Sequence, residues 1–433
     1  MSLAQSRAKL GKDEDGSMKE KLIMSLRAER SNPLWENNRL LRRPSGTPRN
    51  DMQLFSSFVI FVSLVFFVAS CGKAQTPASL KDKFPPERAE LASQMEDIAN
   101  QHIHMPPLPV TYSADRYINV TPEYLRDSLK GKVVLIDIWD YTCINCIQTL
   151  PYIKAWNERY KDKGLVIIGV HAPEFEFEKE SKNLDSAVRQ FGLTYPIIAD
   201  NDYQIWNSLA NQYWPAKYLF DKNGILRVEH FGEGDYEAFE AFLQKILLER
   251  DSTIDVPVPL APVRETDKPN AACYRPTPET YAGLARSNLG NAIVPATGAE
   301  GSTHEYQIPA AMKKDLLYLD GKWTSEKEYV QPAPGAQASL AIDYQAKEAN
   351  LVIHPLAETG FKVIVTQDGK AVPKQDRGSD IQEADGQTFI TVRDARMYRI
   401  TNNQGFARHK LRLTASTPSF GAYAFTFTTA CKQ

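Results

Sequence analysis

The sequence has 433 residues, of which 42% are hydrophobic and 24% are charged, and its formal net charge is −2 at pH 7. A chain of this length folds as two or three domains, and this apolar content excludes a wholly disordered or collagen-like protein. Because there is no basic excess, the composition also argues against a nucleic-acid binder that neutralises phosphates.

The first seventy residues are predicted to lie outside the folded protein. Residues 1–51 are rich in charge, lack a sustained apolar period and are typical of a basic, disordered tail. The uncharged run 54–69 is shorter than the roughly 20 residues of a membrane span, and it resembles the apolar region of a secretory leader. Residues 52–71 are therefore predicted to be an export leader, with translation starting at either Met1 or Met52.

The leader ends in Val68-Ala69-Ser70-Cys71, which resembles a bacterial lipobox. The resemblance implies cleavage before Cys71 and attachment of a lipid to it, which would tether the protein to a membrane. The alternative is an uncleaved signal anchor, with residues 1–51 retained inside by positive charge. Either arrangement places the remaining chain outside the cytoplasm, facing the periplasm or the cell exterior.

Residues 72–105 are predicted to be a linker with one helical stretch, and residues 106–250 to be an α/β domain. The apolar runs 133–139 and 165–170 are predicted buried strands, and 146–161 is the helix between them. This strand–helix–strand spacing indicates a parallel βαβ unit. The further expected elements are a helix at 188–191, strands at 196–199 and 216–220, and a closing helix at 236–249.

The amino-acid composition changes after residue 250. Residues 251–311 are rich in Pro, Ala, Thr and Gly, and they are predicted to be a partly ordered connector. Residues 312–433 contain short β segments separated by turn signals, which indicates an all-β sandwich of the jelly-roll type. The segments are 339–344, 349–353, 361–365, 388–392, 397–400, 410–414 and 423–428.

Cys143 and Cys146 follow a buried strand and open a helix. At a helix N-terminus the dipole stabilises a thiolate on the exposed first cysteine, which can attack a disulfide, and the second cysteine then resolves the mixed disulfide. The alternative is half of a zinc site, but zinc needs four ligands and no second C-x-x-C or matching Cys/His pair lies nearby. The motif predicts a redox-active pair and no metal.

Around this motif the sequence resembles the thioredoxin superfamily. The resemblance assigns Asp137 the role of the buried carboxylate that takes the proton of the second cysteine, since burial raises its pKa. A strand-end aspartate that merely makes a hydrogen bond is the alternative. Trp139 matches the tryptophan packed beneath the active site, and Pro151 matches the proline that kinks the active-site helix.

The segments 141–146 and 213–219 are similar to the exported thioredoxin-like part of DipZ-type proteins. Within them, Trp214-Pro215 matches the family's cis-proline, which faces the dithiol and shapes the substrate groove. That family also has a C-terminal β domain resembling a carbohydrate-binding module, so the resemblance extends to 312–433 and implies that glycan binding is one candidate role. DipZ-type proteins also carry an integral-membrane electron-transfer part upstream, whereas this sequence has a lipoprotein-like leader there.

Asp140 departs from the family pattern, which has a small or hydroxyl residue at this position. Its charge is expected to raise the pKa of Cys143, which argues against a strong oxidant. The loop with His171, Glu174 and Glu178 follows the second strand and is predicted to be structural.

Two features of the C-terminal region bear on function. Cys273 and Cys431 bracket the β domain and are the only cysteines without a role, so they are candidates for a structural disulfide in an oxidising compartment. Two free thiols or a bridge between molecules are the alternatives. Four aromatic residues are candidates for stacking on sugars, although aromatics of a sandwich more often lie in its core: Trp323, Tyr329, Tyr344 and Tyr423.

These observations predict an exported, membrane-tethered thiol–disulfide oxidoreductase that needs no organic cofactor. Cys143 attacks, Cys146 resolves, Asp137 moves the proton and Pro215 shapes the groove. The resemblance implies a membrane thiol-electron donor of the CcdA type and exported disulfide proteins as substrates, with reduction favoured over oxidation. The alternative is a surface lipoprotein that binds a glycan or a protein through 312–433, with a vestigial dithiol.

Overall fold

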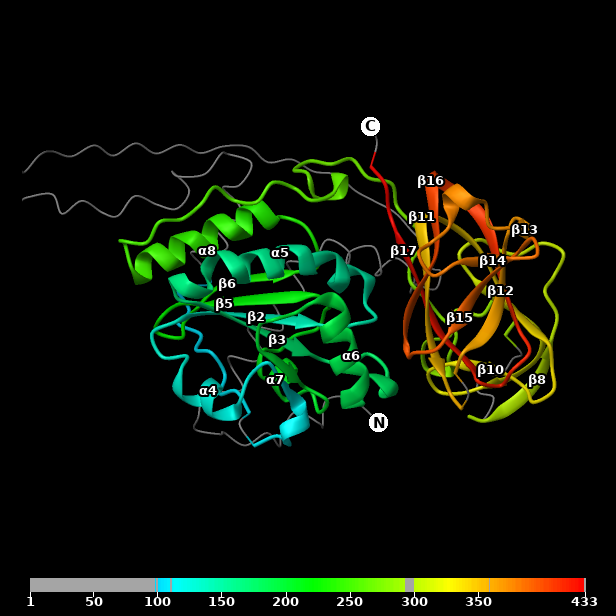
Figure 1. The fold of residues 1–433 in the computed structure, drawn as a ribbon, viewed down its shortest axis with the longest axis horizontal. Helices are drawn as coiled ribbons and strands as arrows, with labels where there is room; N and C mark the ends of the chain where they lie inside the picture. Colours follow the sequence, from blue (N-terminus) through cyan, green and yellow to red (C-terminus); the bar gives the residue numbers. More distant parts are fainter. Residues whose placement is uncertain (1–97, 99, 110, 293–299, 358, 432–433) are drawn as a thin grey trace, which may run out of the picture.

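The computed structural model describes residues 98, 100–109, 111–292, 300–357 and 359–431. They form an α/β domain and an all-β domain that lie side by side (Figure 1). The predicted tail, leader and lipidation site at Cys71, with most of the linker, lie outside the described residues. Within the described part of the chain, no helix is long and apolar enough to cross a membrane.

The α/β domain is built on a six-stranded sheet in the order β1-β4-β3-β2-β5-β6. The strands are β1 (Tyr117–Ile118), β2 (Val133–Trp139), β3 (Leu165–His171), β4 (Ile197–Ala199), β5 (Ala216–Phe220) and β6 (Leu226–Phe231). β2, β3 and β4 are mutually parallel, which confirms the predicted βαβ unit, whereas β5 runs antiparallel to β2 and forms a hairpin with β6.

Helices cover both faces of this sheet (Figure 1). They are α4 (Pro122–Asp127), α5 (Ile144–Tyr160), α6 (Ser181–Phe191), α7 (Gln204–Ser208) and α8 (Tyr236–Arg250). Val133 and Leu135 of β2 pack in the cluster that contains α5, α6 and α8, while Val134 and Ile136 pack in the cluster that contains α4 and α7. Since both faces are covered, β2 and β3 are apolar at every position except Asp137 and His171, which makes these two strands recognisable in the sequence.

The all-β domain contains one 11-stranded sheet, whose main path runs β14-β15-β12-β16-β11-β17-β10-β9-β8. Its strands are β7 (Thr280–Tyr281), β8 (Ser302–Tyr306), β9 (Leu317–Ser325), β10 (Val330–Pro332), β11 (Ala338–Pro355), β12 (Phe361–Gln367), β13 (Lys370–Ala371), β14 (Gln382–Ala384), β15 (Gln387–Val392), β16 (Arg396–Ala415) and β17 (Phe420–Thr428). Short 3-10 helices complete the two domains: η4 (Ala114–Arg116), η5 (Lys161–Lys163), η6 (Glu176–Lys179), η7 (Glu265–Asp267), η8 (Leu284–Arg286) and η9 (Lys374–Asp376).

The sheet folds over on itself through its two long strands, β11 and β16. The first half of β11 pairs with β9 and its second half with β17, and β16 pairs along both halves. The register shifts between Ala346 and Glu348, where a bulge lets the strand bend without losing its partner. The predicted segments 339–344 and 349–353 are therefore one strand, and 397–400 and 410–414 are another.

The predicted connector 251–311 differs from the structure in its second half. Thr277 N–H donates to the carbonyl of Gln345, β7 pairs with β17, and β8 pairs with β9. The all-β domain thus begins near residue 277 and not at 312. Proline and glycine between such short edge strands hide the alternation that a longer strand would show. The first half lies along the α/β domain, where Leu260 N–H donates to Glu240.

The two domains meet beside the start of α5, and β17 contacts that helix. Tyr423 of β17 lies edge-on to Phe175 and Phe177, with ring centroids 5.1 and 4.9 Å apart. Arg286 of the β domain forms an ion pair with Glu174 at 2.5 Å. One apolar cluster contains residues of both domains, among them Ile144, Cys146, Val352, Met397 and Ala424. The β domain therefore packs directly against the segment that carries the cysteine pair.

Candidate active site

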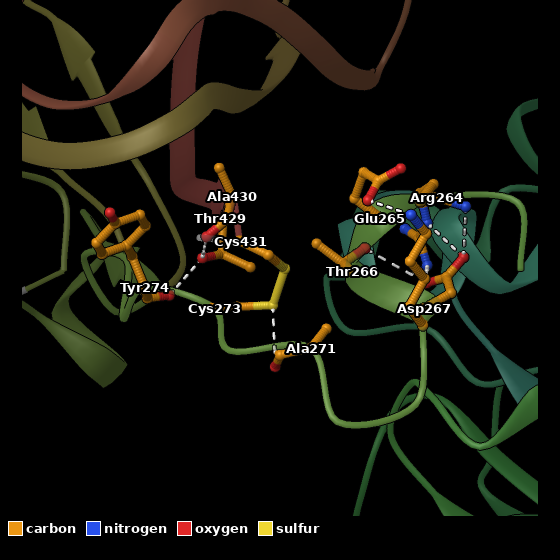
Figure 2. Close-up of a disulfide and its surroundings, with 11 residues drawn as sticks. Arg264, Glu265, Thr266, Asp267, Ala271, Cys273, Tyr274, Thr429, Ala430 and Cys431 are labelled. Carbon is orange, nitrogen blue, oxygen red and sulfur yellow. Dashed lines mark hydrogen bonds and ion pairs between the residues drawn. A yellow bond between two sulfur atoms is a disulfide. The ribbon is translucent and has the colours of Figure 1, made fainter. Parts of the chain in front are cut away.

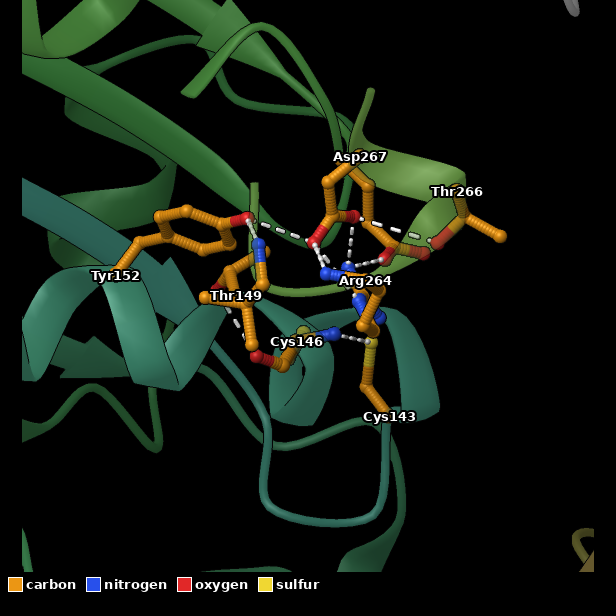
Figure 3. A network of polar contacts seen from close by, with 9 residues as sticks. Cys143, Cys146, Thr149, Tyr152, Arg264, Thr266 and Asp267 are labelled. Atoms are coloured by element: carbon orange, nitrogen blue, oxygen red, sulfur yellow. Dashed lines mark hydrogen bonds and ion pairs between the residues drawn. The ribbon is translucent and has the colours of Figure 1, made fainter. Parts of the chain in front are cut away.

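The two predicted redox cysteines lie at the first turn of α5. Cys143 is the N-cap residue and is partly exposed, Cys146 is fully buried, and both are free thiols. The N–H of Cys146 donates to the Cys143 sulfur at 3.2 Å (Figure 3). Because the first N–H groups of a helix have no helical partners, they stabilise negative charge on this sulfur. The C-x-x-C spacing thus places one sulfur at the surface and the other behind it.

Opposing effects act on the Cys143 thiol. Burial, the neighbouring Cys146 thiol and the charge of Asp140 raise its pKa well above 9.0, while the Cys146 N–H lowers it. Burial also raises the pKa of Cys146, and there Asp137 adds to the increase. The effect of Asp140 has the direction expected from the sequence. The outcome is a dithiol that holds its protons at neutral pH.

Asp137 lies on β2 directly opposite Lys217 of β5. Both side chains are fully buried, and the ammonium lies 3.7 Å from a carboxylate oxygen. Burial raises the pKa of Asp137 to about 6, although the charge of Lys217 opposes this. A carboxyl group that titrates near neutrality is suited to accept a thiol proton. Sequence reasoning missed Lys217, and its one signal is a lone charge in the apolar strand 216–220.

Two further buried carboxyl groups, those of Asp140 and Glu178, fix the loop before Cys143. Asp140 accepts hydrogen bonds from the N–H groups of Thr142 and Glu174, at 2.6 and 3.0 Å. The Thr142 hydroxyl donates to Glu178 at 2.6 Å. Burial and the adjacent Asp140 charge raise the pKa of Glu178 well above its usual range. The predicted structural loop thereby controls the electrostatics of the dithiol.

Aromatic rings pack against the loop that carries the cysteines. His171 stacks on Tyr141 with centroids 5.3 Å apart and meets the edge of Trp139 at 5.6 Å. Burial lowers the pKa of His171 to about 4, so the ring is neutral. Trp139 itself is fully buried at the end of β2. These contacts give the loop a rigid apolar support.

The proline positions singled out from the sequence lie in two elements. The Trp214–Pro215 peptide bond is cis, the carbonyl of Pro215 accepts from Gly232 N–H at 2.8 Å, and the Trp214 indole donates to the Ala172 carbonyl at 2.9 Å. Pro151 lies inside α5, on its exposed side. Pro215 is thus held between the end of β3 and the turn after β6.

Two family models and several relatives match this chain. The AhpC/TSA family model matches residues 120–229, and the model of the thioredoxin like C-terminal domain matches 277–428. The thiol-disulfide oxidoreductase ResA of Bacillus cereus is 33% identical over 122 residues, which cover 28% of this chain and 67% of the relative. The chain belongs to the thioredoxin-like thiol–disulfide oxidoreductases.

A longer match is with protein DipZ of Mycobacterium tuberculosis. It is 37% identical over 246 residues, which cover 56% of this chain and 33% of DipZ. The oxidoreductase thus spans about a third of the length of this relative. Among solved structures, a thioredoxin-like protein in its oxidised form is 29% identical, with 33% of this chain and 95% of that chain covered and a TM-score of 0.29.

In the oxidoreductase, Cys273 and Cys431 form a disulfide (Figure 2). It joins the segment that enters the β domain to the residues that follow β17, where Tyr274 N–H also donates to the carbonyl of Ala430 at 2.9 Å. Cys273 is exposed and Cys431 partly exposed. Within the described part of the chain, no group of three or more His, Cys, Asp or Glu side chains is arranged to hold a metal ion.

The four aromatic candidates for sugar stacking lie mainly in the core. Trp323, Tyr344 and Tyr423 are buried, which agrees with the core alternative. Tyr329 is partly exposed, but its ring stacks on Tyr423 with centroids 4.9 Å apart. Three of the four rings therefore present no face to a ligand, and they instead support the sandwich and its contact with the α/β domain.

Proposed function

We propose that this oxidoreductase reduces disulfide bonds of exported proteins outside the cytoplasm, tethered to a membrane by a lipid on Cys71. The observation that carries the proposal is the pair Cys143 and Cys146 at the helix N-terminus, with the buried Asp137 opposite Lys217. The leader-like residues 52–71 support export. The Cys273–Cys431 disulfide also supports it, because such bonds persist in oxidising compartments.

The reaction proceeds by two thiol–disulfide exchanges. The Cys143 thiolate attacks one sulfur of the substrate disulfide, and the other substrate sulfur leaves as a thiolate. Cys146 then loses its proton to Asp137, whose pKa of about 6 lies close to neutral pH. The Cys146 thiolate attacks the Cys143 sulfur. This releases the second substrate thiolate and leaves a Cys143–Cys146 disulfide. The substrate has gained two electrons, and a membrane thiol donor of the CcdA type restores the dithiol.

The electrostatics of the dithiol support reduction over oxidation. A strong oxidant has a reduced form that is stabilised as a thiolate, which makes its disulfide easy to reduce. Here burial and Asp140 raise the pKa of Cys143, so its thiolate is destabilised. This favours the disulfide product within the protein and hence a low reduction potential.

A redox titration of residues 72–433 in glutathione buffers tests the proposal. Thiols are alkylated and counted by mass spectrometry, and a Cys143→Ser variant identifies the pair that titrates. We expect a reversible couple near about −270 mV, whereas a value near about −120 mV would make the protein an oxidant. A pair that never closes under oxidising conditions would leave the alternative, a surface lipoprotein with a vestigial dithiol.

A further inference from the structure

Asp137 lies too deep in the protein to pass its proton directly to water. Its side chain is fully buried, and so is Cys146, the thiol from which the proposed mechanism takes the proton. A general base has to lose its proton again before it can act a second time. The proton of Asp137 must therefore reach the solvent through neighbouring side chains.

Lys217 is the neighbour that can carry this proton. It lies on β5 opposite Asp137, it is fully buried, and its ammonium is 3.7 Å from a carboxylate oxygen, which is longer than an ordinary hydrogen bond. The Nζ atom has no hydrogen-bond partner among the described residues. Lysine has a flexible four-carbon stem and three donor hydrogens, so an ammonium that no acceptor holds can approach a second acceptor.

His230 lies beyond Lys217 and extends the row of titratable groups. It is directly opposite Lys217 in the β5–β6 pair, so Asp137, Lys217 and His230 lie side by side across three strands, and the His230 ring contacts Phe239 of α8. Burial and the charge of Lys217 lower the pKa of His230 to about 3, so the ring stays neutral and does not take the proton. The ring instead holds the next turn, through a hydrogen bond to the main chain of Glu233.

Glu233 brings a carboxyl group from this row to the surface. It follows the end of β6, and its side chain is 27% exposed on the lining of a cavity between the two domains. The preceding Gly232 donates its N–H to the carbonyl of Pro215 at 2.8 Å, which fixes the turn beside the active site. Glu233 thus has His230 on its buried side and the cavity on its exposed side.

The charges around Glu233 suit it to receive and release a proton. Four further titratable or charged side chains act on it or on its partners: Lys217, Arg264, Tyr236 and Asp267. Burial raises the pKa of Glu233 to about 7, although the charges of Arg264, at 3.0 Å, and of Lys217 oppose this increase. The effect of Lys217 also shows that its ammonium lies within electrostatic reach of this carboxyl group. A carboxyl group that titrates near neutral pH can exchange its proton with water there.

We infer that Lys217 carries the proton of Asp137 to Glu233, which releases it into the cavity. Lys217 first gives one of its ammonium protons to the Glu233 carboxylate. It then takes the proton of Asp137, whose O–H bond breaks as the new N–H bond forms, and the carboxylate of Asp137 lies beside an ammonium again. No electrons move. The inference rests on the proposed function and adds Lys217 and Glu233 to its proton transfers.

Single-turnover oxidation by dithiobis-nitrobenzoate separates proton release from thiol chemistry. The leaving thiolate of this disulfide is coloured and stays ionised at neutral pH, so the reduced protein releases two thiolates and two protons as its own disulfide closes. Stopped-flow absorbance follows the thiolates, and a pH-indicator dye follows the protons. At about pH 8 a carboxyl group with a pKa of about 6 ends ionised, so the second proton, which passes through Asp137, has to leave.

The variants remove the two groups of the route separately. All proteins are the full chain with Cys71→Ser, so that the dithiol alone reacts. Glu233→Gln removes the acceptor at the surface, and Lys217→Met removes the carrier while keeping a long side chain. Glu265→Gln is the matched control, because Glu265 lines the same cavity but is exposed and pairs with Lys268 at 2.6 Å.

We expect the second proton of the wild-type protein to appear together with the second thiolate. In Glu233→Gln and Lys217→Met its rate constant should fall about a hundredfold below that of the thiolate, as for the loss of a positioned proton-transfer group. Glu265→Gln should behave like the wild type. If Lys217→Met does not fold, Glu233→Gln decides alone.

Two results would overturn the inference while the oxidoreductase activity stands. One is a proton that keeps pace with the second thiolate in Glu233→Gln, and the other is an equal delay in Glu265→Gln. A variant with a purely structural defect would slow the release of the thiolates themselves and would not separate the proton from them. If the wild-type protein released no second thiolate, the proposed function itself would fail.

Discussion

The buried Asp137 predicts a particular dependence of stability on pH. Burial raises its pKa from 3.8 to about 6. Between pH 3.8 and about pH 6, Asp137 keeps its proton in the folded protein but has lost it in the unfolded chain. The free energy of unfolding therefore falls as pH rises through this interval. One pKa unit corresponds to about 1.4 kcal/mol, so the shift of about two units costs about 3 kcal/mol above neutrality. Of this, about 2 kcal/mol is lost between about pH 4.5 and about pH 8.

Asp137→Asn removes the titrating group and should remove this part of the pH dependence. The change also leaves Lys217 without its carboxylate, which shifts the stability of the variant at every pH where Lys217 is charged. The quantity to compare is therefore the difference between the two pH values within each protein. Urea denaturation gives it, with Cys143 and Cys146 replaced by serine in both proteins so that the dithiol cannot change state.

Asp115→Asn serves as the control, because Asp115 is exposed and its removal should leave the pH dependence unchanged. Other buried carboxyl groups also change the total slope; burial, for example, raises the pKa of Glu178 well above its usual range. They are common to all three proteins and cancel in the comparison. If wild type and Asp137→Asn lost the same free energy between the two pH values, the raised pKa of Asp137 would be refuted.

Three further outcomes follow from the site. Cys146→Ala should accumulate a mixed disulfide between Cys143 and its substrate, visible on non-reducing gels; a variant that turned over normally would contradict the role of Cys146 as the resolving thiol. Asp140→Asn removes a charge that raises the pKa of Cys143, so the midpoint of its alkylation by iodoacetamide should move to lower pH, and an unmoved midpoint would exclude this coupling. Replacing Cys273 and Cys431 by serine opens a link across a sequence separation of 158 residues, and it should lower the stability of the β domain by about 2–5 kcal/mol in urea, with no loss arguing against a structural role.

The central elements of the α/β domain could be predicted because their patterns are local. Residues 133–139 and 165–170 are apolar almost throughout, since helices cover both faces of a parallel sheet. The cysteine pair is equally local: three residues span about one helical turn, so Cys143 and Cys146 meet wherever a helix begins there. The spacing also accounts for the bond from Cys146 N–H to the Cys143 sulfur.

The strands of the β domain are harder to predict from the sequence because they are irregular. β11 and β16 each contain two predicted segments, since a bulge or a polar stretch interrupts the apolar alternation while the pairing continues. β7 and β8 were assigned to a connector because two to five residues are too few to show a period of two. Their partners are β17, which lies far along the chain, and β9, which follows β8 after the segment 307–316. Pairing of this kind leaves no local signal.

By itself, the sequence predicted the parts of the site: a dithiol at a helix start, an acid on the buried strand six residues before it, and the dipeptide Trp214-Pro215, which the resemblance marked as a cis-proline. Tertiary structure alone decided what surrounds that chemistry. Lys217 meets Asp137 only because β5 pairs with β2, and Asp267 meets Tyr152 only because the connector returns to α5. These partners lie about 80 to 120 residues from the groups they serve, and at that separation contact is set by strand register and domain packing, which no short-range pattern records.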